Sequence, residues 1–142
     1  MRIDILTKHD LNPLIQDQIS KLFRQLGGDK NQVALSEILE EKNQITLAYC
    51  SENTKIEGIA MMGTYKVISG KKGWIEDVVV QADSRGKGIG RKLITKLLEA
   101  AKQKNLSEIL LFTEDHRTAA IQLYTQLGFK VKDSRIYTLK LN

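Results

Sequence analysis

The most informative stretch of this chain is R-G-K-G-I-G-R, residues Arg85–Arg91. Its glycines are Gly86, Gly88 and Gly90, and its other members are Arg85, Lys87, Ile89 and Arg91. Glycine lets the backbone approach a ligand closely and adopt a positive φ. An apolar helical pattern starts directly after the stretch, and the free N–H groups and dipole of a helix N-terminus attract an anion. With its basic side chains, the stretch predicts a cradle for a phosphate, most simply a pyrophosphate.

The spacing of this loop differs from two better-known phosphate cradles. A P-loop requires G-x-x-x-x-G-K-[ST], which this chain does not contain. A dinucleotide-binding fingerprint requires G-x-G-x-x-G, whereas the loop reads G-x-G-x-G. The alternative to a phosphate cradle is a positively charged turn that binds no ligand.

Outward from the loop, the second half of the chain alternates strands and helices. Trp74–Gln81 (W-I-E-D-V-V-V-Q) reads as a strand that enters the loop at Asp83–Gly90. Apolar residues from Leu93 to Ala101 then mark one face of a helix that runs to about Lys104. The remaining expected elements are a strand at Ile109–Phe112, a helix at Thr118–Leu127, and extended segments at Phe129–Val131 and Ile136–Leu141.

The first half of the chain carries no chemical motif, but its periodicity is readable. Helical spacing covers Leu11–Leu26 and, more briefly, Val33–Glu41. Strands are expected at Arg2–Leu6, Ile45–Cys50 and Ile56–Lys66, and a turn at Ser69–Gly73. The order of elements predicts an α/β chain with one mixed sheet.

Length and composition limit the class of protein. With 142 residues, 42% apolar and 27% charged, the chain fits a single globular domain, residues 1–142. No apolar run reaches the roughly 20 residues of a membrane span, and the charged start, Met1–Asp10, is unlike a signal peptide. The single cysteine, Cys50, excludes an intrachain disulfide and a cysteine-based metal cluster, so we expect a cytoplasmic protein.

The formal charge of +5 suits an anionic ligand. Nucleic acid is the simplest partner for a basic chain, yet the basic residues are spread out, without zinc-finger spacing or a basic region followed by heptads. A phosphorylated small molecule explains the charge equally well, and we expect neither nucleic acid nor membrane as a partner.

Three segments together resemble the GNAT superfamily of acetyl-CoA-dependent N-acyltransferases. R-G-K-G-I-G fits the form [Q/R]-x-x-G-x-[G/A] of that family's coenzyme A pyrophosphate loop. I-E-D-V-V-V-Q-A-D-S before it is similar to the family's preceding strand, and A-A-I-Q-L-Y-T-Q-L-G-F, Ala119–Phe129, to its C-terminal helix. The resemblance covers roughly residues 74–131. It implies a single-domain GNAT fold, with a mixed sheet of six to seven strands and about four helices.

The resemblance also implies a chemistry and the residues that carry it. Acetyl-CoA would be the co-substrate and a primary amine the acceptor, and the amine must lose a proton before it attacks. Val78, Val79 and Val80 would hold the pantetheine arm and offer a backbone N–H to the acetyl carbonyl. The loop Arg85–Arg91 would hold the pyrophosphate, and Tyr124 would protonate the leaving thiolate, unless it is an ordinary packing tyrosine.

Two adjacent acids, Glu76 and Asp77, are candidates for the base. Neighbours on a strand point to opposite faces, so only one can face the amine unless a bulge intervenes. We favour Glu76, which on a regular strand shares a face with Val78 and Val80, and keep Asp77 in reserve. The structural alternative for either acid is an ion pair or a solvated strand end.

Three further residues have open roles. Arg117 stands where many relatives carry an asparagine that contacts the coenzyme. Arg117 could pair with a coenzyme phosphate or with an acidic group of the substrate, and the alternative is an ordinary surface arginine. His116 is read as an exposed residue near a helix start rather than as a base. Cys50 is read as a small buried strand residue rather than an acyl carrier.

The acceptor is not readable from the sequence. G-W-I-E-D-V-V-V, Gly73–Val80, is most similar to glucosamine-6-phosphate N-acetyltransferases, which leaves a phosphosugar as an alternative to an unidentified amine. A non-catalytic acyl-CoA-binding module and a basic nucleic-acid-binding domain are the alternatives from other classes. A homodimer, paired through Ile136–Leu141, is a further expectation.

Overall fold

The computed structural model of the chain describes residues 1–28 and 31–142, which form two units, Met1–Phe112 and Thr113–Asn142. The first unit contains the whole sheet and the helices α1, α2 and α3, and the second contains α4. Within the described ranges, none of the helices has the length and apolar character needed to cross a membrane.

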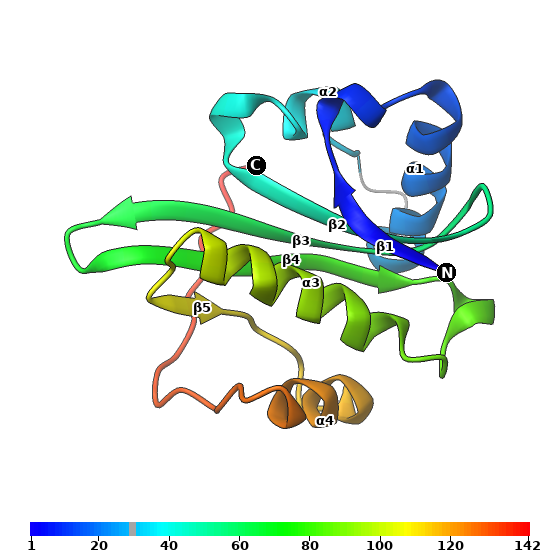
Figure 1. Cartoon of the computed structure of the whole chain (residues 1–142). Helices are drawn as coiled ribbons and strands as arrows, with labels where there is room; N and C mark the ends of the chain where they lie inside the picture. The colour runs from blue at the N-terminus through cyan, green and yellow to red at the C-terminus, as the bar shows by residue number, and fades with distance from the viewer. Residues whose placement is uncertain (29–30) are drawn as a thin grey trace. The chain divides into compact units, whose positions relative to one another are not determined.

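The sheet has five strands in the order β1-β2-β3-β4-β5. They are β1 (Arg2–Leu6), β2 (Ile45–Glu52), β3 (Lys55–Val67), β4 (Gly70–Val80) and β5 (Glu108–Leu110). The first three pairs are antiparallel and β4 pairs with β5 in parallel, so the expected mixed sheet is confirmed. Figure 1 shows the long β3–β4 hairpin in green.

Five strands are found in the described chain, where six to seven were expected. The missing ones are Phe129–Val131 and Ile136–Leu141, whose backbone has no regular secondary structure. An alternating pattern favours extended backbone, but a strand forms only where a neighbouring strand accepts its hydrogen bonds. The expected turn at Ser69–Gly73 is also too long, because β4 already begins at Gly70 and Lys71 pairs with Lys66.

The described residues form four α-helices, as expected: α1 (Pro13–Gly27), α2 (Leu35–Ile38) and α3 (Ile89–Gln103) in the first unit, and α4 (Thr118–Gln126) in the second. Asn12 caps α1 by accepting a hydrogen bond from the Ile15 backbone N–H, and Pro13 occupies the first helical position. The α2 helix is a single turn, shorter than the expected Val33–Glu41, because the backbone is extended at Ala34 on one side and at Glu40 on the other.

Helices α1 and α3 cover opposite faces of the sheet (Figure 1). Ile19 and Leu22 of α1 belong to a buried cluster with Ile59 and Met61, which are two residues apart on β3. Gly58, on the other face, lies against α3: a Cβ added there would come 3.0 Å from Ile89 and 3.1 Å from Leu93. Alternation along β3 therefore fixes which side chains of β4 can face α1 and which face α3.

Candidate functional site

A β-bulge in β4 sets the geometry of the candidate site. Glu76 pairs with Met61 and Val79 with Ile59, so two residues of β4, Asp77 and Val78, stand opposite the single Ala60. Asp77 adopts a φ of 49°, in the left-handed region that Asn and Asp tolerate better than other non-glycine residues. The expectation that Glu76 shares a face with Val78 and Val80 is therefore wrong. The extra residue shifts the alternation, and Glu76 shares the α1 face with Val79 instead.

The bulge brings both acids to one cavity of about 670 Å³. Its walls come from α1, the segment 31–38, and strands β2, β3 and β4. Apolar side chains, among them Phe23 and Met61, form much of the lining, and Glu76 and Asp77 both reach it. Without the bulge, the adjacent Glu76 and Asp77 would point to opposite faces of the strand and could not both face one ligand.

The acids have raised pKa values in this setting. Partial desolvation at the cavity wall, and second the negative charge of Asp77, raise the pKa of Glu76 above its usual range. The Glu76 side chain remains exposed at the edge of the cavity. Desolvation also raises the pKa of the half-buried Asp77. A carboxylate with a raised pKa is a stronger proton acceptor near neutral pH.

The edge of β4 that faces away from β3 is open along its second half. The β4–β5 ladder ends at the pair Trp74–Leu110, whereas β4 continues to Val80. Within the sheet as described, residues 75–80 therefore have no strand partner on that side. Val78, Val79 and Val80 lie on this stretch, and an extended ligand could pair with it as an added strand does.

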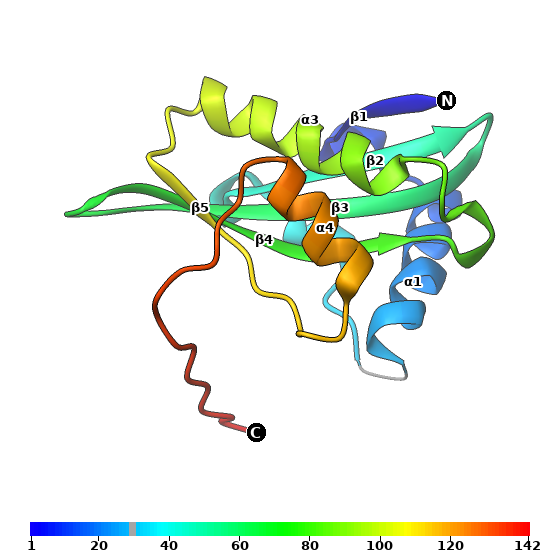
Figure 2. The same cartoon turned by 90° about the horizontal axis from the view of Figure 1, so that it is seen from below.

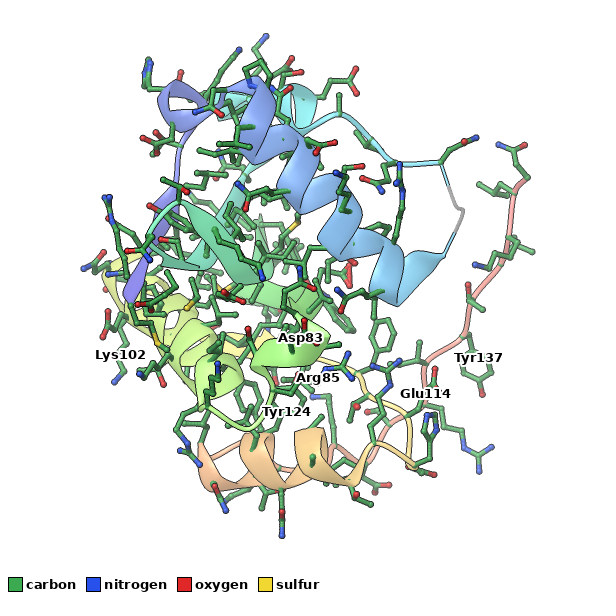
Figure 3. All side chains as sticks on the ribbon, turned by 90° about the vertical axis from the view of Figure 1, so that its right-hand side faces the viewer. Asp83, Arg85, Lys102, Glu114, Tyr124 and Tyr137 are labelled. Atoms are coloured by element: carbon green, nitrogen blue, oxygen red, sulfur yellow. The ribbon has the colours of Figure 1, made fainter. Side chains whose placement is uncertain are left out.

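The glycine loop connects the end of β4 to α3, as Figure 2 shows from below. Asp83 and Arg85 mark the point where the chain leaves the sheet (Figure 3). Gly86 and Gly88 have φ values of 82° and 77°, and a Cβ at either would meet no heavy atom within 4 Å. The space beside the loop is open to a ligand, and the exposed Arg85, Lys87 and Arg91 make it positive.

Hydrogen bonds from β3 and α1 hold the start of the loop. Ser84 is 4% exposed, and its hydroxyl donates to the Glu57 carboxylate, while the Gln81 backbone N–H donates to the Glu57 carbonyl at 2.7 Å. The Gln25 side chain on α1 also donates to the Gln81 side chain. Sequence reasoning missed these residues, since a lone serine or glutamate carries no pattern that distinguishes it from a surface residue.

Replacing Ser84 with alanine is expected to destabilise the fold by about 1.5–3 kcal/mol, the contribution of a hydrogen bond to a charged group. It should also weaken binding to the loop, because the segment Gln81–Arg85 loses its attachment to Glu57. Urea unfolding, followed by a titration with acetyl-CoA, measures both effects. Ser107→Ala is the control: that hydroxyl donates to the Lys71 carbonyl at an exposed position, and its loss should leave both quantities nearly unchanged. A stability of Ser84→Ala equal to that of the control would contradict the assignment.

The second unit contains the remaining candidates. Tyr124 on α4 is half-buried and packs edge-on against Phe129, with ring centroids 5.9 Å apart. Burial raises the pKa of the Tyr124 phenol, and the positive charge of Arg117 lowers it by less. Arg117 is exposed at the start of α4, and the exposed His116 has its Nδ1 3.3 Å from Glu114 Oε2.

Cys50 is fully buried in β2, as expected, and burial raises the pKa of its thiol. An acyl carrier needs an accessible thiolate, so this residue has a structural place only.

Sequence reasoning also missed an aromatic cluster beside Glu76. Trp74 packs edge-on against Phe112, with centroids 5.9 Å apart, and its Nε1 donates to the Tyr65 hydroxyl at 3.2 Å. Together with Glu76 these side chains line a second cavity, of about 400 Å³. Trp74 opens the quoted strand and could have been singled out as an aromatic next to an acid, but Tyr65 and Phe112 are distant in sequence.

Comparison with known proteins agrees with this geometry. Residues 13–129 match the model of the Acetyltransferase (GNAT) family. The chain is 33% identical over 78 residues to an L-methionine sulfoximine/L-methionine sulfone acetyltransferase of Pseudomonas aeruginosa, covering 54% of this chain and 45% of that protein. It is 30% identical over 128 residues to streptothricin acetyltransferase A of Bacillus subtilis, covering 87% of this chain and 69% of that protein.

A solved structure gives the same fold. An acetyltransferase of Trypanosoma brucei superposes with a TM-score of 0.80 at 24% identity, covering 99% of each chain. The chain spans 45% of the length of the first of its curated relatives. The similarity to these relatives therefore indicates a common family, and it does not assign their substrates to this chain. With the loop, the bulged strand and the match over residues 13–129, the chain belongs to the GNAT family of acetyltransferases.

Proposed function

We propose that this protein transfers an acetyl group from acetyl-CoA directly to a primary amine. The observation that carries the proposal is the continuity of β4. Its bulge presents Glu76 and Asp77 to a cavity, its second half has an open edge, and its end leads into the glycine loop and the N-terminus of α3. An amine site, a place for an extended arm and an anion cradle thus follow one another along a single strand.

The residues of the strand and loop fit acetyl-CoA. The open edge of β4 at Val78, Val79 and Val80 suits the amide-bearing pantetheine arm, and the loop with the first turn of α3 suits the pyrophosphate. Arg85, Lys87 and Arg91 add charge there, and Arg117 is a further candidate for a phosphate contact. When bound, acetyl-CoA would supply the activated acetyl thioester.

The acids would perform the proton transfer that the amine needs. A primary ammonium of the lysine type has a pKa of about 10.4, so it is protonated at neutral pH and must lose a proton before it attacks. Glu76, with Asp77 as the alternative, would accept this proton directly or through water. Backbone N–H groups of β4 beyond the bulge would stabilise negative charge on the acetyl oxygen.

Replacing Tyr124 with phenylalanine is expected to lower kcat at least tenfold and to leave the affinity for acetyl-CoA within about twofold, because general acid catalysis contributes a factor of about 100 or more. The phenyl ring keeps the packing on Phe129, so the fold should be preserved. Steady-state kinetics and a binding titration measure the two quantities. Tyr137→Phe, at a position 88% exposed, is the matched control (Figure 3). An unchanged kcat in Tyr124→Phe would remove this residue from the mechanism.

The test of the proposed function is acetyl-CoA-dependent release of free thiol on a panel of primary amines. Release that requires both the protein and an amine, with the acetylated amine identified by mass spectrometry, supports the transferase. Binding of acetyl-CoA without release on any amine contradicts it and favours a non-catalytic acyl-CoA-binding module. Including glucosamine 6-phosphate in the panel tests the phosphosugar alternative.

A further inference from the structure

Among the residues that the structure describes, the charged side chains that line the cavity at the β4 bulge are all acidic. Seventeen described residues line it, and its charged members are Glu76 and Asp77, with no lysine, arginine or histidine among the seventeen. The other members are apolar side chains such as Phe23 and Met61 and neutral polar ones such as Gln16. The sequence as a whole carries +5, so the composition of this cavity is opposite to that of the chain.

Three of the basic residues of the chain lie together at the glycine loop. Arg85, Lys87 and Arg91 belong to the segment that enters α3, and none of them lines either cavity at Glu76. These three side chains lie where the proposed function places a pyrophosphate. They give no argument for a second anion at the bulge.

The second cavity, of about 400 Å³, also combines a carboxylate with uncharged walls. The two cavities are neighbours, because both are lined by Glu76, Asn43 and Ile45. Trp74 and Phe112 supply aromatic faces on that side. The described lining of the second cavity contains no basic side chain either. Aromatic faces beside a carboxylate attract cations and accept apolar groups.

We infer that the acceptor is a primary amine that carries no anionic group, with its ammonium at Glu76 and Asp77 and an uncharged, partly apolar body against the surrounding walls. This rests on the proposed function and narrows its substrate class. A carboxylate or phosphate on the same molecule would enter a partly desolvated site beside two carboxylates, and none of the described lining residues is a cation that could compensate the lost hydration. Phosphosugars and free α-amino acids are therefore disfavoured.

Matched pairs that differ by one anionic group test this inference. Tyramine is compared with tyrosine, and glucosamine with glucosamine 6-phosphate. We expect kcat/KM to be at least tenfold higher for the member without the anion in each pair, and equilibrium binding measured by calorimetry without acetyl-CoA to follow the same order. Equal or higher values for tyrosine and glucosamine 6-phosphate would overturn the inference, and so would failure of both tyramine and glucosamine to bind at millimolar concentration.

A variant with an added positive charge in the cavity tests the inference independently. Gln16 is exposed on α1 and lines the cavity, so Gln16→Arg introduces a cation without a core change. It should reduce the ratio for tyramine over tyrosine at least threefold. Asp17→Asn changes the net charge by the same amount on the same helix, away from the cavity lining, and should leave the ratio unchanged. Equal ratios in Gln16→Arg and Asp17→Asn would count against the inference.

The two failures are distinguishable. If tyramine binds more tightly than tyrosine but no amine is acetylated, the proposed function fails and the inference about the cavity stands. If acetylation occurs with the anionic member of each pair preferred, the function stands and the inference fails.

Discussion

Replacing Glu76 with glutamine lowers kcat at least 100-fold at pH 7 in our expectation, because the amide cannot accept the proton of the ammonium and base catalysis contributes a factor of about 100–10,000. Glutamine keeps the shape of the side chain and its pairing position opposite Met61. Asp77→Asn is the matched variant on the adjacent residue. Asparagine tolerates the positive φ of 49° at that position, so the bulge should persist, and the loss of kcat should be less than tenfold.

The pH profile identifies the base more sharply than the rate at one pH. The base must be unprotonated, so kcat should rise with pH through its pKa, and the raised pKa values of Glu76 and Asp77 place this limb above the usual range of a carboxyl group. Glu76→Gln should remove the limb from the residual rate. A profile that loses this limb in Asp77→Asn and keeps it in Glu76→Gln would transfer the role to Asp77.

We expect Glu76→Gln to lower the activity of the protein without lowering its stability. A carboxyl group whose pKa is raised in the folded state favours folding while it is protonated, below its unfolded pKa, and this contribution is lost as the pH rises through the folded pKa. Ionised Glu76 and Asp77 therefore oppose folding at neutral pH. Glu76→Gln should unfold at an equal or higher urea concentration than the parent at pH 7, which separates loss of chemistry from loss of fold.

Replacing Gly88 with valine should weaken acetyl-CoA binding at least tenfold, equivalent to about 1.4 kcal/mol. Gly88 is the N-cap of α3 with a φ of 77°, where a residue with a side chain costs about 1–2 kcal/mol and a β-branched one is a rarer outlier still. The loop must either accept that strain or rearrange, and the added methyl groups would occupy the space beside the backbone. An equilibrium titration with acetyl-CoA measures the effect.

Gly70→Ala controls for strain in general. Gly70 also has a positive φ, of 146°, and an added Cβ would lie 2.6 Å from Ser107 Oγ, at the β3–β4 turn rather than the loop. This variant should lose stability and keep its affinity for acetyl-CoA. Equal affinity losses in Gly88→Val and Gly70→Ala would mean that the loop is not a binding element.

The sequence predicted most elements of the fold because their signals are local. Asn12 and Pro13 mark the start of α1, glycines precede α3, and the apolar residues of α3 recur at helical spacing. It overestimated the sheet at Ile136–Leu141, since extended backbone is a local preference and pairing is not. It overestimated the length of α2 for a similar reason: apolar spacing indicates which face of a helix is buried, but not where the backbone leaves the helical conformation, as it does at Ala34 and Glu40.

The glycine loop could be found from residue types and spacing alone, and the adjacent acids and the tyrosine through the resemblance to the family. The way in which the two acids face a ligand depends on the tertiary structure. A regular strand would send Glu76 and Asp77 to opposite faces, and the bulge that brings both to one cavity depends on the register between β3 and β4. The described lining of that cavity likewise comes from α1, β2, β3 and β4 and from residues 31–38, and a local sequence pattern does not show which side chains of such distant segments face the same space.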